Sequence, residues 1–227
     1  MPRVKHVPEG FDLSQALAGI TIDRGQAIGP QIYAALRHRI VDGRLPGGTP
    51  IHENDIAALC LVSRTPLRGA LQQLVNEGLI VTRPQVGSVV APPDSSRLKE
   101  ALFVRSAIEQ HVVRRLATTG LDEAALVPVM ERQAAAAEID DYAGFFDADE
   151  EFHASLARMA DVPNAWQLVH SIKAHVDRER FLLLASTPGR SRQAYGDHLR
   201  ILDAIRSADG DRAAREMAAH VASVLDP

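Results

Sequence analysis

The sequence has a single cysteine, few aromatic residues and no long apolar run. Cys60 alone cannot form an internal disulfide or a cysteine-based zinc site, which favours a reducing cytoplasm. Aromatic residues make up 4% of the chain, too few for a stacking platform that binds single-stranded nucleic acid. No apolar run approaches the ~20 residues that span a bilayer, and the first residues lack the apolar segment of a signal peptide. We therefore expect a cytoplasmic protein without membrane contact.

Motifs of common enzymes are also missing: no His-Glu-x-x-His helix, nucleophile elbow or phosphate-binding loop occurs. What is present is the composition of a folded protein, with 227 residues of which 46% are hydrophobic and 24% charged. The net charge of −4 is unevenly distributed. Residues 1–93 have nine Lys and Arg against seven Asp and Glu, whereas residues 94–227 have sixteen against twenty-two. The difference is a weak indication of a polyanionic partner for the first part only.

Composition and hydrophobic periodicity divide the chain into two domains. The run APPDSS over residues 91–96 predicts a linker, because successive prolines interrupt helices and strands. We expect an N-terminal arm over 1–25, a small domain over 26–91, a linker over 92–96 and a larger domain over 97–227.

The small domain has the pattern of a winged helix-turn-helix. Ser63 is a suitable N-cap for its third helix, and Gly78 fits the position after that helix, where a positive φ is common. The predicted elements are helices over 29–41, 53–60 and 63–78, then hairpin strands over 79–83 and 88–90.

The larger domain is predicted to be an all-α antiparallel bundle, so the fold class is mainly α. Pro128 should bend the second helix or mark its start. The predicted helices cover residues 97–118, 122–138, 141–160, 164–186, 191–207 and 210–225.

The helix over 63–78 has one apolar and one polar face. Leu67, Ala70, Leu71 and Leu74 follow the spacing of a buried stripe. The opposite face has hydrogen-bonding side chains in its N-terminal half: Arg64, Thr65, Arg68 and Gln72. A recognition helix presents this half to the major groove, where Arg can bind guanine bidentately. The alternative is a solvated helix face, which the preceding short helix and the following hairpin make the weaker interpretation.

Further DNA contacts are expected beside this face. The backbone amides of Ser63 and Arg64 lie at the positive end of the helix and can bind a phosphate. Gly87 at the hairpin tip lets the backbone approach the minor groove, and Arg83 can add a phosphate contact.

The run IAALCLVSRTPLRGAL over residues 56–71 resembles the DNA-binding domain of GntR-family transcription regulators, and the match extends over residues 31–90. The resemblance implies DNA contacts by Arg64, Thr65 and Arg68, with Gly87 at the tip of the wing. The chain departs from the family pattern at Gly69, where relatives usually have Glu. It departs again at Asn54, where some relatives have a basic contact residue.

The larger domain has polar residues in apolar stripes. The four that matter are Asp149, His153, His198 and His220. Asp149 and His153 are four residues apart and therefore share a helix face. A single inward histidine is usually a hydrogen-bonded core residue, but a buried carboxylate needs a partner. One divalent cation would satisfy all four side chains; Zn²⁺ suits this donor set, with Ni²⁺ or Mn²⁺ as alternatives.

These positions resemble the metal ligands of the FCD effector domain in the FadR-like branch of the GntR family. The matching segments are DEEFH over 149–153, YGDH over 195–198 and MAAH over 217–220, and Asn164 fits the same pattern. Arg105 also lies on an inward stripe, and the resemblance implies that it holds an effector carboxylate. An ion pair with Glu109, one turn away, is the other interpretation of Arg105.

These observations predict a transcription regulator that binds double-stranded DNA as a homodimer at a palindromic operator. A small organic acid at the bundle metal would be its effector, and family analogy favours repression. Two alternatives remain: a metal sensor whose effector is the ion itself, and a metal-dependent hydrolase with Glu150 or Glu151 as its base.

Overall fold

The computed structural model describes residues 10–83, 87–184 and 187–225. The chain forms two compact units. The first includes residues up to Ser95 together with Asp177–Phe181, and the second runs from Ser96 to Val176 and resumes at Leu182.

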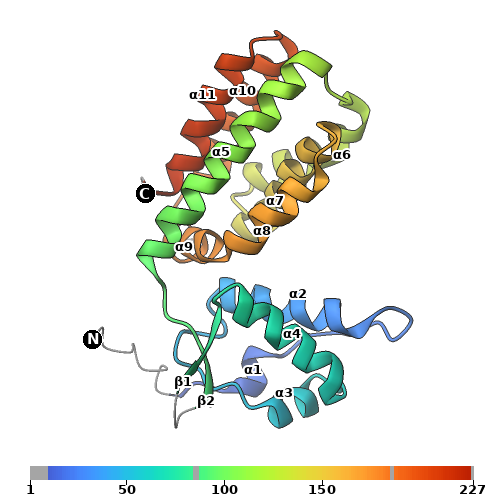
Figure 1. Ribbon diagram of the computed structural model, residues 1–227, viewed down its shortest axis with the longest axis vertical. Helices are drawn as coiled ribbons and strands as arrows, with labels where there is room; N and C mark the ends of the chain where they lie inside the picture. The colour runs from blue at the N-terminus through green and yellow to red at the C-terminus, as the bar shows by residue number, and fades with distance from the viewer. Residues whose placement is uncertain (1–9, 84–86, 185–186, 226–227) are drawn as a thin grey trace. The chain divides into compact units, whose positions relative to one another are not determined.

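The N-terminal unit has the predicted winged helix-turn-helix fold (Figure 1). Its strands are antiparallel, with Ile80 opposite Val90 and Arg83 opposite Gly87. The expected hairpin turn at 84–86 lies outside the described residues. The elements are α1 (Leu13–Ala16), α2 (Ile28–Val41), α3 (Glu53–Leu59), α4 (Arg64–Asn76), β1 (Ile80–Arg83) and β2 (Gly87–Val90).

The α4 helix forms for the reasons that its sequence indicates. Its four predicted core residues, Leu67, Ala70, Leu71 and Leu74, are all buried. Beyond the C-cap at Glu77, Gly78 has the positive φ of 74° that ends the helix. Ser63 is the N-cap residue. Its backbone is extended, as expected at this position, but its side chain makes no capping hydrogen bond.

Part of the expected N-terminal arm is folded. Asp12 caps α1 by accepting a hydrogen bond from the Ser14 amide, 2.8 Å away. Ala16 and Leu17 are buried, so α1 contributes apolar surface to the core. Residues 1–9 lie outside the described part.

The second unit is helical in its described residues, as predicted (Figure 1). Its α5 is one long helix, and α10 and α11 pack side by side. The elements from residue 95 on are α5 (Ser95–Thr119), α6 (Glu123–Glu138), α7 (Tyr142–Met159), α8 (Pro163–Ile172), α9 (Ala174–Leu184), α10 (Arg190–Arg206), α11 (Gly210–Ala222) and the 3₁₀ turn η1 (Ser223–Leu225). Within α9, Asp177–Phe181 belong to the first unit.

Two features differ from the predictions. The helix expected over 164–186 is interrupted at Lys173, whose buried ammonium lies 2.5 Å from Glu150, and its expected end at 185–186 lies outside the described residues. Pro128 does not begin a helix, because α6 starts at Glu123 behind the N-cap Asp122.

The core of this unit joins α5, α6, α7, α10 and α11. It includes the fully buried residues Val113, Leu116, Phe152, Ile201 and Ala213. No helix in the described part of the chain is long and apolar enough to cross a membrane. Buried ionisable side chains lie among these apolar residues, and Asp149, His153, His198 and His220 are four of them.

Candidate functional site

Four buried side chains converge inside the helical unit: Asp149 and His153 from α7, His198 from α10 and His220 from α11. One ligand atom from each lies within 4.8 Å of the others. Asp149 Oδ1 is 3.4 Å from His198 Nε2, 3.8 Å from His153 Nε2 and 4.0 Å from His220 Nε2. The structure therefore brings together all four residues that the sequence singled out as metal ligands.

The outer nitrogen of each imidazole faces an oxygen. Gln133 Oε1 is hydrogen-bonded to His198 Nδ1 at 2.8 Å, and Asp197 Oδ2 to His220 Nδ1 at 3.2 Å. Glu109 Oε2 is 2.5 Å from His153 Nδ1, an ion-pair contact without the geometry of a hydrogen bond. An accepting oxygen behind His198 and His220 favours the tautomer with its proton on Nδ1 and leaves Nε2 unprotonated. This second layer of side chains gives the cluster the arrangement of a histidine metal site.

The cluster has the chemistry that a divalent cation needs. Three neutral imidazoles and one carboxylate are common ligands of Zn²⁺ and related ions. Burial, with the nearby His198 and His153, outweighs the hydrogen bond to Asp197 and lowers the pKa of His220 to about 3. His220 is therefore neutral at physiological pH, as a ligand must be.

Arg105 reaches the cluster from α5. Only 1% of its surface is exposed, and its Nη2 donates a hydrogen bond to His153 Nε2 at 2.9 Å. Its Nε also donates to Glu109 Oε1 at 2.6 Å. Burial raises the pKa of Glu109, but Arg105 and His153 outweigh it and hold the pKa at about 2. Arg105 thus has both the ion pair with Glu109 and a position facing the proposed ligands.

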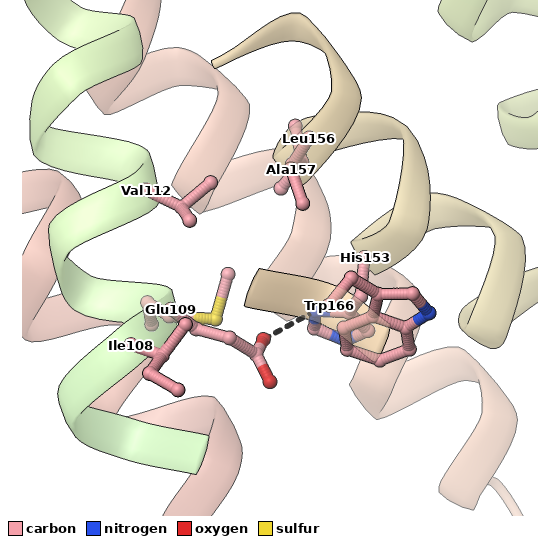
Figure 2. A pocket seen from close by; sticks show the side chains of 8 residues that line it. Ile108, Glu109, Val112, His153, Leu156, Ala157 and Trp166 are labelled. Atoms are coloured by element: carbon pink, nitrogen blue, oxygen red, sulfur yellow. Dashed lines mark ion pairs between the residues drawn. The ribbon is translucent and has the colours of Figure 1, made fainter. Parts of the chain in front are cut away.

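A small cavity lies beside His153 (Figure 2). Its volume of about 10 Å³ is the room of a single water molecule, so an organic acid would need side chains to move. Trp166 stacks on the His153 ring, with centroids 5.6 Å apart and an interplanar angle of 11°. The lining is mostly apolar: Ile108, Glu109, Val112, His153, Leu156, Ala157, Trp166 and Met217.

The second candidate site is the exposed face of α4 in the N-terminal unit. Ser63, Arg64, Thr65, Arg68 and Gln72 are all exposed there. The carboxylate of Glu53, at the start of α3, accepts a hydrogen bond from Arg68 Nε at 2.8 Å, and its Oε2 lies 3.5 Å from Arg64 Nη2. Two guanidiniums and two uncharged polar side chains on one exposed face can bind phosphates and base edges.

The described part of the hairpin is exposed at Gly87. Gly87 has a φ of 89°, and a Cβ built on it would meet no atom within 4 Å. Arg83, opposite Gly87 in the hairpin, is half-buried. The two positions that depart from the family pattern, Asn54 and Gly69, are exposed.

A winged helix-turn-helix with an exposed basic helix face, followed by a helical domain with a buried polar cluster, defines a DNA-binding transcription regulator. Comparison with known proteins specifies the family. Residues 29–90 match the family described as bacterial regulatory proteins, gntR family, and residues 100–223 match the FCD domain. The chain belongs to the GntR family, in the group with an FCD domain, and is a regulator of transcription and not an enzyme.

Individual relatives agree with this assignment. The HTH-type transcriptional repressor RspR of Escherichia coli (strain K12) is 34% identical over 205 residues, covering 88% of this chain and 89% of that protein. The gluconate operon transcriptional repressor of Bacillus subtilis (strain 168) is 32% identical over 177 residues, covering 77% of this chain and 71% of that protein. The solved structure of E. coli McbR/YncC shares the fold, with a TM-score of 0.75 at 18% identity over 87% of this chain and 95% of that one.

Sequence reasoning missed part of the cluster. The sequence indicates Glu109 only as a partner of Arg105, and it gives no indication of Gln133 or Asp197. Gln133 directly precedes the four alanines at 134–137 in α6, and the local sequence gives no sign of its buried role. Asn164 is exposed at the start of α8 and is not among the converging residues.

Proposed function

We propose that this protein is a cytoplasmic repressor whose operator binding is controlled by a small carboxylate at a metal ion in the helical domain. Residues 26–91 bind DNA, and residues 97–227 bind the effector and form a homodimer. The observation that carries the proposal is the convergence of one carboxylate oxygen and three imidazole nitrogens within 4.8 Å. Repression is supported by relatives such as RspR, which is named a transcriptional repressor.

Asp149, His153, His198 and His220 would hold the ion. Zn²⁺ is the best match to their donor atoms, with Ni²⁺ or Mn²⁺ as alternatives. When bound, the ion would supply a Lewis-acidic charge that accepts a carboxylate oxygen of the effector. Gln133 and Asp197 would keep His198 and His220 in the tautomer that this role requires, and the Glu109 carboxylate lies 2.5 Å from His153 Nδ1.

Arg105 would bind the effector carboxylate, because its guanidinium is buried and faces the same imidazoles. One relative is named for a gluconate operon, and gluconate is a small organic acid. The restricted cavity beside His153 favours a small effector that induces movement of the helices. Such movement would change the spacing of the two DNA-binding domains through residues 92–96.

On the DNA, Arg64, Thr65, Arg68 and Gln72 would read base edges in the major groove. The amide of Ser63, Arg83 and the backbone at Gly87 would contact phosphates or the minor groove. A homodimer places two such helices on the two halves of a palindromic operator.

The test combines metal analysis of the purified protein with mass spectrometry of any small molecule released on denaturation. We expect about one divalent ion per chain and a carboxylate whose addition weakens operator binding. Protein that binds no ion under any loading condition would refute the metal site. Loss of operator binding on chelation alone, without any organic acid, would instead make the ion itself the effector.

A further inference from the structure

We propose that Arg105 competes with the metal ion for His153, so that loading the site transfers its guanidinium from an imidazole to an anion. This inference rests on the proposed function, because it assigns a second role to a residue of the same site. It predicts that removing Arg105 strengthens metal binding, the opposite of what loss of a stabilising ion pair would do.

The first observation is a group of three buried side chains linked through Arg105. Arg105 Nε donates to Glu109 Oε1 at 2.6 Å, and Arg105 Nη2 donates to His153 Nε2 at 2.9 Å. Glu109 Oε2 lies 2.5 Å from His153 Nδ1, an ion-pair contact without the geometry of a hydrogen bond. Arg105 is 1% exposed, Glu109 4% and His153 2%, so bulk water does not weaken these contacts.

The second step follows from the chemistry of the donor and the acceptor. A guanidinium has N–H donors and no acceptor, so His153 Nε2 must accept through its lone pair. That lone pair is the one His153 would use as a metal ligand, since its other nitrogen faces Glu109. One lone pair cannot serve both partners. Arg105 must therefore leave His153 Nε2 before His153 can act as a ligand.

The third step concerns where the guanidinium goes. Its Nε contact to Glu109 does not involve His153, so Glu109 can retain Arg105 while Nη2 turns away. Two cations close together repel each other in a buried site, and an anion between them reduces this repulsion. A carboxylate would then accept the hydrogen bond that Arg105 Nη2 no longer donates to His153. Metal and anion would consequently increase each other's affinity, because such coupling is reciprocal.

The experiment measures Zn²⁺ affinity by competition with a chromophoric chelator, without any organic acid. We compare the wild type with Arg105→Gln and Glu109→Gln, and with Arg115→Gln as the control. Arg115 is an exposed arginine on the same helix.

Removing a hydrogen bond from a charged donor should tighten Zn²⁺ binding of Arg105→Gln by about tenfold or more. Removing the carboxylate behind His153 should weaken binding of Glu109→Gln by roughly 10–100-fold. The control should match the wild type. With Zn²⁺ bound, acetate should bind more weakly to Arg105→Gln than to the wild type.

If the Arg105–Glu109 ion pair only stabilised the fold, its loss would weaken Zn²⁺ binding in both Arg105→Gln and Glu109→Gln. Unchanged or weaker Zn²⁺ binding by Arg105→Gln would therefore overturn the inference, while Zn²⁺ binding by the wild type would still support the proposed function. If the wild type binds no Zn²⁺, Ni²⁺ or Mn²⁺, both fail. If Arg105→Gln lacks the helical circular dichroism of the wild type, the test is repeated with Arg105→Lys. Lysine keeps the positive charge but lacks the forked geometry of the guanidinium.

Discussion

The side chain of Gln133 offers a direct test of how the buried cluster is organised. Gln133 is fully buried on α6, donates to the Ala148 carbonyl at 3.1 Å, and places its Oε1 2.8 Å from His198 Nδ1. Methionine has a side chain of similar length in which a weakly accepting thioether replaces the amide oxygen. Without that oxygen, His198 can move its proton to Nε2, which lies 3.4 Å from Asp149 Oδ1. The Nε2 lone pair would then be lost from the centre of the cluster.

Loss of an acceptor behind a histidine ligand typically weakens metal binding by about 10–100-fold. For Gln133→Met this corresponds to about 1.4–2.8 kcal/mol, since each tenfold change is about 1.4 kcal/mol. Chelator competition with Zn²⁺ at constant pH measures the change directly. The matched control is Gln110→Met, which removes a half-buried glutamine whose amide donates to Ser106 Oγ at 2.8 Å. Wild-type Zn²⁺ affinity in Gln133→Met would show that this oxygen does not set the tautomer of His198.

Three further results are expected. Arg68→Ala should lower operator affinity by about 1–3 kcal/mol in a DNA-binding titration if Arg68 contacts a base, and unchanged affinity would reject that contact. His198→Ala should bind less metal, and at metal concentrations near 100 times the wild-type Kd it should unfold roughly 5–10 °C below the wild type; full metal content would exclude His198 as a ligand. Burial raises the pKa of Asp42, but hydrogen bonds with His38 and Arg44 outweigh it and lower the pKa to about 2. A carboxylate with a lowered pKa stabilises the fold above about pH 4, and this contribution disappears as the pH falls through about 2. Asp42→Asn should therefore be less stable to urea than the wild type at pH 6 and approach it near pH 2, whereas a constant difference would contradict the assignment.

The elements that could be predicted from sequence are those with strong local signals. In α4, the apolar spacing and Gly78 fix both the buried face and the end of the helix. The convergence of Asp149, His153, His198 and His220 was also predictable, because a carboxylate and histidines in apolar stripes need shared partners. Their mutual distances depend on how three helices pack, which only the structure provides.

Other features depend on tertiary neighbours and left no local signal. The break at Lys173 accompanies a buried ion pair with Glu150, a residue of another helix, and no glycine or proline marks it in the sequence. Asp197 is adjacent in sequence to His198 in α10, but it hydrogen-bonds to His220 of α11. Its position next to His198 therefore does not indicate which histidine it orients. Residues that orient ligands across helices are therefore the least accessible to sequence reasoning.

The stacking of Trp166 on His153 has a practical consequence. The chain contains one tryptophan, and its ring lies 5.6 Å from the imidazole that Arg105 contacts. Intrinsic fluorescence excited at the indole band therefore arises from a chromophore at the edge of the cluster. Quenching or a spectral shift during a titration would follow events at this imidazole without any attached dye, in the unmodified protein.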